Sequence, residues 1–313
     1  LRQSNLRETS LAKLNSLVQE HILPTLGDYS LGDLSSRVLA NWQASLCAKG
    51  YKHNYLLRIY SALNGMLNYA AKMKYIPENP TKNLEKIREV DFSAPDEKIH
   101  YYTAEEFLRF QQTANLAVHN YYERSVYMFL VIAYYTGMRK GEIHALRWSD
   151  LCDGTIRVRR SISQKVKGKS AVETAPKNKA SVRTLQIPIP LQTLLDQYII
   201  LQKSEFSKNW SPDFKVIYGP HCISDTGLSN FNKAWAKATG LEPIRIHDYR
   251  HSHASLLANE GINIQEIARR LGHADVKITW QTYAHLYPRE EERALAVLNR
   301  VVVASHEFPT NNP

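Results

Sequence analysis

Apolar residues recur at helical spacing through the first ninety positions of the chain. Leu11, Leu14, Val18 and Ile22 share one face of a predicted helix, and Pro24 is expected to end it, because proline cannot continue the helical hydrogen-bond ladder. Two further helices are predicted from stripes of the same spacing: Leu34, Val38, Trp42 and Leu46, then Leu56, Tyr60, Leu63, Leu67 and Ala70. The pattern predicts a small all-α domain.

The helical pattern stops at residues 91–98, which are polar, contain Pro95 and show no periodicity. Thr103 follows, with Glu106 three residues later, a pairing typical of the capping box at the start of a helix. The expected organisation is a helical domain at 1–93, a linker at 94–102 and a second domain at 103–313.

The second domain mixes helical and strand periodicity. Residues 121–135 form a long apolar stretch that predicts a helix ending at Gly137. Residues 155–160 and 182–188 alternate apolar and polar positions, as strands with one exposed face do. Helical patterns follow at residues 141–148, 191–201, 226–239, 247–259 and 264–271, around Tyr283, and at 289–300. The predicted fold class is mainly α with a small β-sheet (α+β).

Composition indicates a packed protein with a polyanionic partner. Apolar residues make up 43% of the chain and charged residues 22%, which favours a globular core over disorder. The 40 Lys and Arg residues against 30 Asp and Glu give a net charge of +10, and both predicted domains share the excess. This balance suits nucleic acid, although a basic protein without such a partner would have it too.

Cysteine usage and hydropathy narrow the class of protein further. Cys47, Cys152 and Cys222 are far apart and form neither a disulfide framework nor a metal-binding pair, which favours a reducing, cytoplasmic environment. No apolar run approaches the roughly 20 residues of a membrane span. No carboxylate cluster suited to Mg²⁺ is visible. We therefore expect no membrane association, no metal and no cofactor.

The most concentrated candidate chemistry lies at residues 247–253, His-Asp-Tyr-Arg-His-Ser-His. On a helix His247 and Arg250 are three positions apart and share a face, which His251 could join. An arginine offers two parallel donors to a phosphate, and a histidine can give or take a proton near neutral pH. The stretch therefore suits the binding and chemistry of a phosphate group.

Four other residues extend this pattern along the chain. Arg139 comes upstream with Glu142 one turn later, and His273 and Tyr283 come downstream. Each has an ordinary explanation when taken alone: a solvated arginine, an exposed ion pair, a capping histidine and one of 18 tyrosines. Their combination and order, and no single residue, indicate phosphoryl transfer to a tyrosine.

Five motifs make the C-terminal two-thirds resemble the catalytic domain of the tyrosine recombinases, the phage integrase family. They are Thr-Gly-x-Arg-x-Gly-Glu, Lys-x-Lys-x-Ser-x-Arg-Thr, His-x-x-Arg-His-x-His-Ala, Leu-Gly-His and Thr-x-x-x-Tyr-x-His. The nearest-looking branch is the integrases of temperate phages and conjugative transposons of Gram-positive bacteria. The N-terminal part resembles the family's helical core-binding domain. Tyr249 and Trp280 depart from the pattern, which commonly has leucine and a small or polar residue there.

The resemblance implies a site-specific recombinase that cleaves and rejoins DNA through a 3′-phosphotyrosyl link. Arg139 and Arg250 would bind the scissile phosphate. Lys177 would give a proton to the leaving 5′ oxygen, with Lys179 as a rival two residues away. His247 would assist proton transfer.

Three more roles come from the same resemblance. His273 would hydrogen-bond the phosphate, Tyr283 would be the nucleophile, and Glu142 would support the site. Such a cationic site can stabilise the charge of phosphoryl transfer without a metal. The covalent link keeps the energy of a phosphoester, so rejoining would need no ATP.

The resemblance also implies partners: double-stranded attachment-site DNA and a homo-tetramer on that DNA, in the bacterial cytoplasm. An excisionase or a host DNA-bending protein would be the accessory factor. Residues expected to track the DNA backbone are Arg157, Arg159, Lys165 and Lys167. An apolar C-terminal strip is expected to dock into a neighbouring subunit, with packing on its own domain as the alternative: Ala294, Val297, Leu298 and Val301.

Two other functions remain open at this point. A type IB topoisomerase shares this chemistry but acts as a monomer on one strand. A transcription regulator is the second, because residues 262–273 look like part of a helix-turn-helix. A regulator, however, would not require Arg139, His247, Arg250 and Tyr283 to occur together.

Overall fold

The computed structural model describes residues 8–87, 100–163, 172–174 and 179–287, together with Leu295 and Leu298. Contacts between Cα atoms divide the chain into two compact units. The first comprises residues 1–98 with 163–172, and the second comprises 99–162 and 173–313. Most of the expected linker, 94–102, lies outside the described residues.

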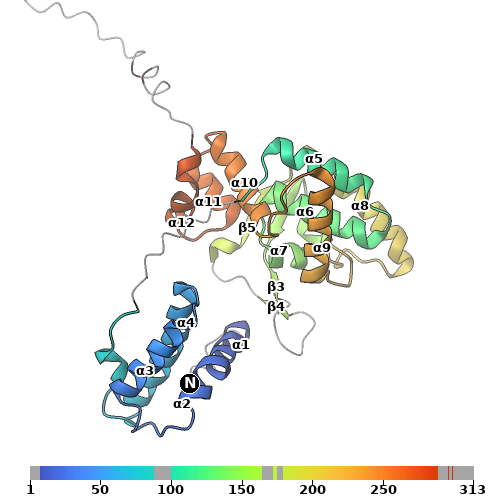
Figure 1. Cartoon of the computed structure of the whole chain (residues 1–313). Helices are drawn as coiled ribbons and strands as arrows, with labels where there is room; N and C mark the ends of the chain where they lie inside the picture. The colour runs from blue at the N-terminus through green and yellow to red at the C-terminus, as the bar shows by residue number, and fades with distance from the viewer. Residues whose placement is uncertain are drawn as a thin grey trace, which may run out of the picture. The chain divides into compact units, whose positions relative to one another are not determined.

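The N-terminal unit is a group of helices joined by short turns (Figure 1). Its elements are α1 (Glu8–Leu17), the π-helical turn η1 (Val18–Ile22), α2 (Leu23–Leu26), α3 (Ser36–Cys47), α4 (His53–Lys72) and the 3-10 turn η2 (Pro80–Asn83). The prediction that Pro24 ends the first helix is wrong, because the helical path continues through η1 into α2. Pro24 lies in the first turn of α2, where a missing N–H group costs little.

The apolar stripes predicted for this unit form its core. Leu39, Trp42, Ile59 and Leu63 come from α3 and α4 and are at most 3% exposed. Burying an apolar side chain of this size contributes roughly 1.5–3 kcal/mol to folding. Ser35 caps α3 by accepting a hydrogen bond from the backbone N–H of Val38. The helices predicted from the stripes are therefore confirmed.

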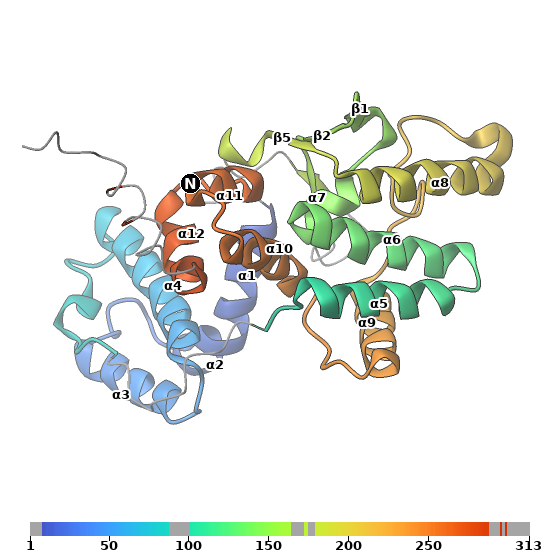
Figure 2. The same ribbon diagram turned by 90° about the horizontal axis from the view of Figure 1, so that it is seen from above.

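The second unit is built around α6 (Tyr121–Thr136) (Figure 2). This helix is buried without interruption from Ser125 to Tyr134, because its sequence is apolar on every side. Four helices pack against α6: α5 (Ala104–Leu116), α8 (Ile189–Phe206), α9 (Asp225–Thr239) and α10 (Asp248–Asn259). The predicted capping box opens α5, with both bonds between Thr103 and Glu106 formed.

The described strands form two small antiparallel sheets. The first has the order β1 (Leu151–Cys152), β2 (Thr155–Val158), β5 (Arg183–Gln186), and the second joins β3 (Ser161–Ser163) to β4 (Val172–Thr174). Asp153 and Gly154 connect β1 to β2 with φ values of 50° and 68°, as a two-residue hairpin of type I′ requires. The two predicted strands are confirmed in β2 and β5, whereas β1, β3 and β4 were not predicted.

Short elements and three C-terminal helices complete the described residues. The short elements are α7 (Lys140–Ala145), η3 (Trp148–Asp150), η4 (Lys179–Ser181) and η5 (Ser207–Asn209). The C-terminal ones are α11 (Ile264–Leu271), α12 (Val276–Tyr283) and η6 (Ala284–Leu286), grouped beside α10 in Figures 1 and 2. The helix predicted at 289–300 lies outside the described residues, apart from Leu295 and Leu298. The predicted fold class, mainly α with small sheets, is confirmed.

Candidate active site

Two glycines in the left-handed region shape the candidate active site. Gly137 ends α6 with φ 63°, and Gly272 ends α11 with φ 67°. A side chain at Gly137 would also collide with its surroundings, because a Cβ there would lie 2.7 Å from the ring of His253. Both positions therefore require glycine.

Each of these glycines supplies a carbonyl oxygen to one of the two expected catalytic arginines. Arg250 Nη1 donates to the oxygen of Gly137 at 2.7 Å, and Arg139 Nη2 donates to the oxygen of Gly272 at 3.2 Å. Arg139 comes directly before α7, and Arg250 lies on α10. The turns after α6 and α11 thus hold both guanidinium groups in the same small region.

Glu142 lies between two arginines. Its Oε1 accepts from Arg139 Nη1 at 2.9 Å, and its Oε2 accepts from Arg183 Nη2 at 2.9 Å. Burial by itself would raise the pKa of Glu142, but the hydrogen bonds and charge of Arg183, followed by those of Arg139, hold that pKa below its usual value. Glu142 therefore stays ionised and fixes both arginines.

Arg183 is a part of this cluster to which the sequence analysis gave no role. It projects inward from β5, its side chain is 3% exposed, and its Nε donates to the carbonyl oxygen of Arg270 at 2.6 Å. The sequence signal was present in the alternation of the strand, where Arg183 shares the buried face with Leu185. A buried charged residue in that pattern indicates a fixed partner.

The cluster carries more positive than negative charge. Arg250 is 3% exposed, and burial, followed by the charge of Arg139, lowers the pKa of its guanidinium to about 9. It therefore remains charged at neutral pH. Arg139, Arg183 and Arg250 face one buried carboxylate, that of Glu142, so the cluster is suited to an anion.

His273 bridges Arg250 and α12. Arg250 Nη2 lies 2.9 Å from His273 Nε2, and because a guanidinium only donates, Nε2 is the acceptor. The ring proton is then on Nδ1, which donates to Thr279 Oγ1 at 2.8 Å. Burial, then the charges of Arg250 and Arg139, lower the pKa of His273 to about 4, so the ring is neutral. Thr279 is fully buried and was not anticipated from the sequence.

Tyr283, the last residue of α12, is 2% exposed. Its ring packs in a small core formed with Ala254, Ala258, Ile267 and Leu271. Burial raises the pKa of its hydroxyl well above the usual value, and Arg250 opposes that rise. The hydroxyl lies 2.6 Å from Nδ1 of His251. His251 is therefore the histidine that contacts the tyrosine hydroxyl.

His247 is the N-cap residue of α10 and is partly exposed. Its ring meets that of His251 edge-on, with centroids 5.2 Å apart. Partial burial of the imidazole, followed by the positive potential of His251 and Arg250, lowers the pKa of His247 to about 4. Within the described part of the chain we find no hydrogen bond from its ring.

Three of the expected lysines lie outside the described residues: Lys165, Lys167 and Lys177. Lys179, the rival of Lys177, lies in η4 just before β5. The structure therefore brings together Arg139, Glu142, Arg250, His273 and Tyr283, with His247 at the edge of the group.

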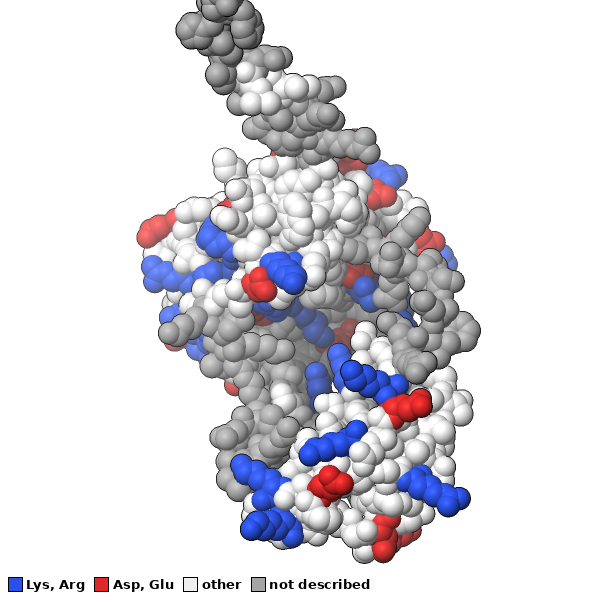
Figure 3. All heavy atoms as spheres, turned by 90° about the vertical axis from the view of Figure 1, so that its left-hand side faces the viewer, with Lys and Arg blue, Asp and Glu red and all other residues white. Residues whose placement is uncertain are grey.

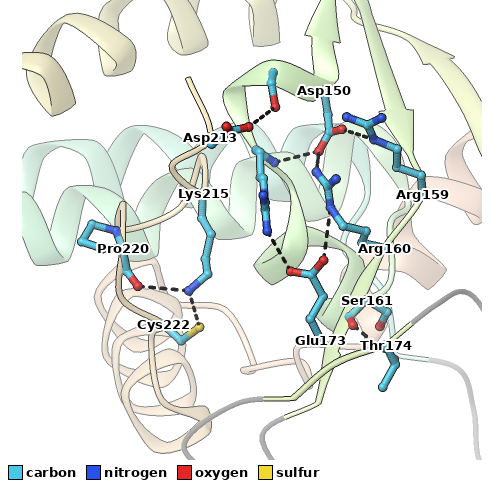
Figure 4. A network of polar contacts seen from close by, with 12 residues as sticks. Asp150, Arg159, Arg160, Ser161, Glu173, Thr174, Asp213, Lys215, Pro220 and Cys222 are labelled. Atoms are coloured by element: carbon cyan, nitrogen blue, oxygen red, sulfur yellow. Dashed lines mark hydrogen bonds and ion pairs between the residues drawn. The ribbon is translucent and has the colours of Figure 1, made fainter. Parts of the chain in front are cut away.

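Figure 4 shows a second polar network at the base of the β3–β4 pair. Arg159, an expected DNA contact, donates from Nε to Asp150 at 2.6 Å and is 48% exposed. Arg160 bonds the same buried carboxylate and also approaches Glu173 at 3.6 Å. Arg157 is exposed on β2. Arg159 is thus tied to the fold and keeps part of its surface in solvent.

The two departures from the family pattern have different surroundings. Tyr249 is fully buried and its hydroxyl donates to Asn232 Oδ1 at 2.6 Å, so its polar group is satisfied within the core. Its ring packs edge-on against Tyr102 and Phe107. Trp280 is 55% exposed on α12. Neither residue enters the cluster around Arg250.

Charged side chains also lie outside the cluster. On the side of the molecule drawn in Figure 3, Lys and Arg side chains lie on the surface with acidic side chains among them. Among the described residues, no group of three or more His, Cys, Asp or Glu is placed to hold a metal ion. None of the described helices is long and apolar enough to cross a membrane.

Comparison with known proteins finds the same family that the sequence motifs resemble. Residues 101–290 match the sequence profile of the phage integrase family, and residues 2–47 match the N-terminal SAM-like domain of phage integrases. The ICEBs1 integrase of Bacillus subtilis is 26% identical over 280 residues, which cover 88% of this chain and 73% of that protein.

Two solved structures share the fold. The Tn1549 transposon integrase, in complex with a circular intermediate DNA, superposes with a TM-score of 0.72 at 17% identity and covers 96% of each chain. The lambda integrase dimer bound to a core site superposes with a TM-score of 0.61 at 20% identity, covering 88% of this chain and 89% of that one.

Proposed function

The chain belongs to the phage integrase family, and from that premise we propose that it cleaves and rejoins DNA strands through a 3′-phosphotyrosyl link on Tyr283. The observation that carries the proposal is that the Tyr283 hydroxyl, hydrogen-bonded to His251, is within the electrostatic influence of Arg250, a buried member of the arginine cluster. Arg250 acts electrostatically on the hydroxyl and also contacts His273. A helix-turn-helix regulator has no need of this arrangement.

The cationic cluster suits the scissile phosphate. Arg139 and Arg250 bind its non-bridging oxygens and stabilise the charge that develops on them. His273 hydrogen-bonds the same group once Nε2 has also taken up a proton, which the negative charge of a bound phosphate favours. Glu142 and Arg183 position Arg139 rather than touching the substrate. Fixed donors of this kind require little rearrangement during the reaction, so they stabilise the transition state more than water would.

The reaction exchanges one phosphoester for another. The oxygen of Tyr283 forms a bond to phosphorus while the bond to the 5′ oxygen breaks, and Lys177 gives that oxygen a proton. A tyrosine with a raised pKa is a poor nucleophile until its proton is removed, so a base must act as the attack proceeds. Attack by a 5′ hydroxyl on the phosphotyrosine reverses the steps and rejoins the strand.

Attachment-site DNA is the proposed substrate, in the bacterial cytoplasm. The N-terminal unit would act as a core-binding domain, and both parts of the chain are basic. Arg157, Arg159, Lys165 and Lys167 are proposed backbone contacts. Binding through phosphate contacts should weaken with salt with a log–log slope of about −0.9 per contact.

We further propose that the active form is a tetramer on DNA, with accessory help from an excisionase or a DNA-bending protein. The proposed link between subunits is the apolar strip Ala294, Val297, Leu298 and Val301. Of these, only Leu298 is among the described residues, and it is 63% exposed. An exposed leucine close after the nucleophile helix suits docking in a neighbour.

The experiment that tests this function measures strand exchange between two duplexes. Full-length protein should exchange strands and form tetrameric complexes on native gels, whereas deletion of 294–313 should abolish both and leave single-site binding intact. Relaxation of supercoils by the monomer without any strand exchange would favour a topoisomerase and contradict the proposal.

A further inference from the structure

The hydroxyl of the proposed nucleophile touches a histidine that the comparison with family motifs left without a role. His251 Nδ1 lies 2.6 Å from Tyr283 Oη, and the two ring centroids are 5.8 Å apart. His247 is one helical turn earlier and meets His251 only ring against ring. We propose that His251 is the catalytic base that takes the proton of Tyr283 as its oxygen attacks phosphorus. The inference rests on the proposed role of Tyr283.

The contact has the geometry that a proton transfer needs. A base must lie within hydrogen-bond distance, about 2.6–3.2 Å, of the group it deprotonates. The phenol is a donor while it holds its proton, so an unprotonated Nδ1 is its acceptor, and the ring hydrogen is then on Nε2. Tyr283 is held rigidly because its ring is buried between α10, α11 and α12. The proton therefore has a short path to Nδ1 of His251.

The charged and titratable groups around His251 decide its protonation: His247, Asp248, Arg250, Arg245 and Tyr283. Burial lowers the pKa of His251, the carboxylate of Asp248 opposes this, and Arg250 and Arg245 lower it further. The ring is consequently neutral at pH 7 and its lone pair is free to accept a proton.

A bound phosphate would make His251 a stronger base. The cations that now disfavour a positive charge on His251 would be neutralised in part by the phosphate they bind. Asp248 is 2% exposed, and its carboxylate also favours a protonated His251. The site thus becomes a better proton acceptor when substrate is present, which limits deprotonation of Tyr283 in the free protein.

The step is balanced in atoms and charge. The O–H bond of Tyr283 breaks and an N–H bond forms on His251, while the new O–P bond replaces the bond to the 5′ oxygen, which takes its proton from Lys177. On rejoining, the 5′ hydroxyl returns its proton to Lys177 and bonds to phosphorus, the tyrosine oxygen leaves, and His251 returns its proton to that oxygen. His247 stays neutral, because two imidazolium rings with centroids 5.2 Å apart would repel each other.

The test compares His251→Asn with His251→Ala in single-turnover cleavage of a suicide substrate. The asparagine amide occupies nearly the place of Nδ1 and can still hold the tyrosine hydroxyl, but it cannot take a proton. Both variants should bind DNA as tightly as the native protein and cleave it roughly 10²–10⁴-fold more slowly. The fall in rate toward acid pH, which reports His251, should be absent in both.

Two further measurements separate a base from a residue that only holds the tyrosine. A 5′-phosphorothiolate leaving group, which needs no proton, should not restore cleavage by His251→Asn. Replacing Tyr283 with 3,5-difluorotyrosine, a more acidic phenol, should restore it more than tenfold. Native cleavage and an unchanged pH profile in His251→Asn would overturn the proposal, as would a rate loss that difluorotyrosine leaves untouched.

The same assays distinguish an error in the nucleophile assignment from an error in the role of His251. If Tyr283→Phe still forms covalent adducts, the nucleophile assignment itself is wrong. If Tyr283→Phe is inactive and His251→Asn cleaves normally, only the role of His251 is wrong. Should the asparagine variant fail to bind DNA, His251→Gln takes its place in the same assays, since it also keeps an amide near the hydroxyl.

Discussion

The guanidinium of Arg250 is held by the backbone of Gly137, whose carbonyl oxygen accepts from Nη1 at 2.7 Å across 113 positions of sequence. Gly272 does the same for Arg139. In both cases the glycine ends a helix in a conformation that other residues adopt only at a cost. The spacing of the two arginines is therefore set by two helix ends.

Replacing Gly137 with alanine should destabilise the protein more than its conformation alone explains. The left-handed conformation costs alanine about 1 kcal/mol. The new Cβ would also lie 2.7 Å from His253 and 2.9 Å from Leu271, and such overpacking typically costs roughly 1–3 kcal/mol more. Denaturant unfolding measures the difference.

Gly240→Ala is the matched control, because Gly240 also ends a helix with φ 76° but has nothing within 4 Å of an added Cβ. Gly240→Ala should lose only the stability that the left-handed conformation costs alanine, about 1 kcal/mol. Equal losses for the two variants would show that the packing around Gly137 is not tight.

Glu142→Gln should be strongly destabilising. Arg183 would keep its buried position with no carboxylate beside it, and breaking a buried ion pair on one side costs roughly 3–5 kcal/mol. Glu266→Gln is the control, because Glu266 pairs with Arg269 on the surface, where such pairs contribute at most about 1 kcal/mol. A Glu142→Gln variant as stable as the control would contradict the buried-pair account.

The same carboxylate predicts a pH dependence of stability. The folded pKa of Glu142 lies below its unfolded value, so the folded state binds this proton less well. Its stabilising contribution is complete above the unfolded pKa and is lost as pH falls through the folded one. Unfolding free energies measured from pH 7 to pH 3 should therefore fall less in Glu142→Gln than in the native protein.

Much of the fold was predictable because it follows local patterns. The apolar stripes around Leu39, Ile59 and Leu63, the capping box at Thr103 and the apolar run of α6 each determine a helix from a few neighbouring residues. The ends of α6 and α11 were predictable from Gly137 and Gly272 for the same reason.

What could not be predicted depends on contacts between distant segments. Pro24 looked like a helix end, but the π-turn before it changes the local hydrogen bonding. Arg183 pairs with Glu142 across 41 positions, and Thr279 matters only because His273 is folded against it. The family resemblance gave a role in proton transfer to His247 and none to His251, whereas packing of α12 brings the hydroxyl of Tyr283 to His251.

Thr279→Val should impair catalysis more than its small change in shape implies. Valine keeps the size of threonine but removes the oxygen that accepts from Nδ1 of His273. Without that acceptor, the proton of the His273 ring is no longer fixed on Nδ1. We expect a stability loss of about 1 kcal/mol, with a fall in cleavage rate and little change in DNA affinity. Thr282→Val is the control on the same helix, since that hydroxyl bonds only the carbonyl of Ile278. Equal cleavage rates for the two variants would show that Thr279 does not act through His273.

The general acid, which protonates the leaving 5′ oxygen, is identified by comparing Lys177→Ala with Lys179→Ala. Substituting the residue that protonates the leaving oxygen should slow cleavage of ordinary DNA, and a 5′-bridging phosphorothiolate should restore it, because a thiolate leaves without a proton. We expect this rescue for Lys177. Rescue limited to Lys179→Ala would transfer the role to Lys179.

Whether Tyr283 forms the covalent link is tested most directly by isolating the adduct on a suicide substrate and identifying the attached peptide by mass spectrometry. We expect the nucleotide on Tyr283, no adduct with Tyr283→Phe despite native DNA affinity, and normal adduct with Tyr287→Phe. Tyr287 is a suitable control because its hydroxyl donates to Ile262, away from the arginines. A nucleotide on any other residue, or undiminished adduct in Tyr283→Phe, would contradict the account.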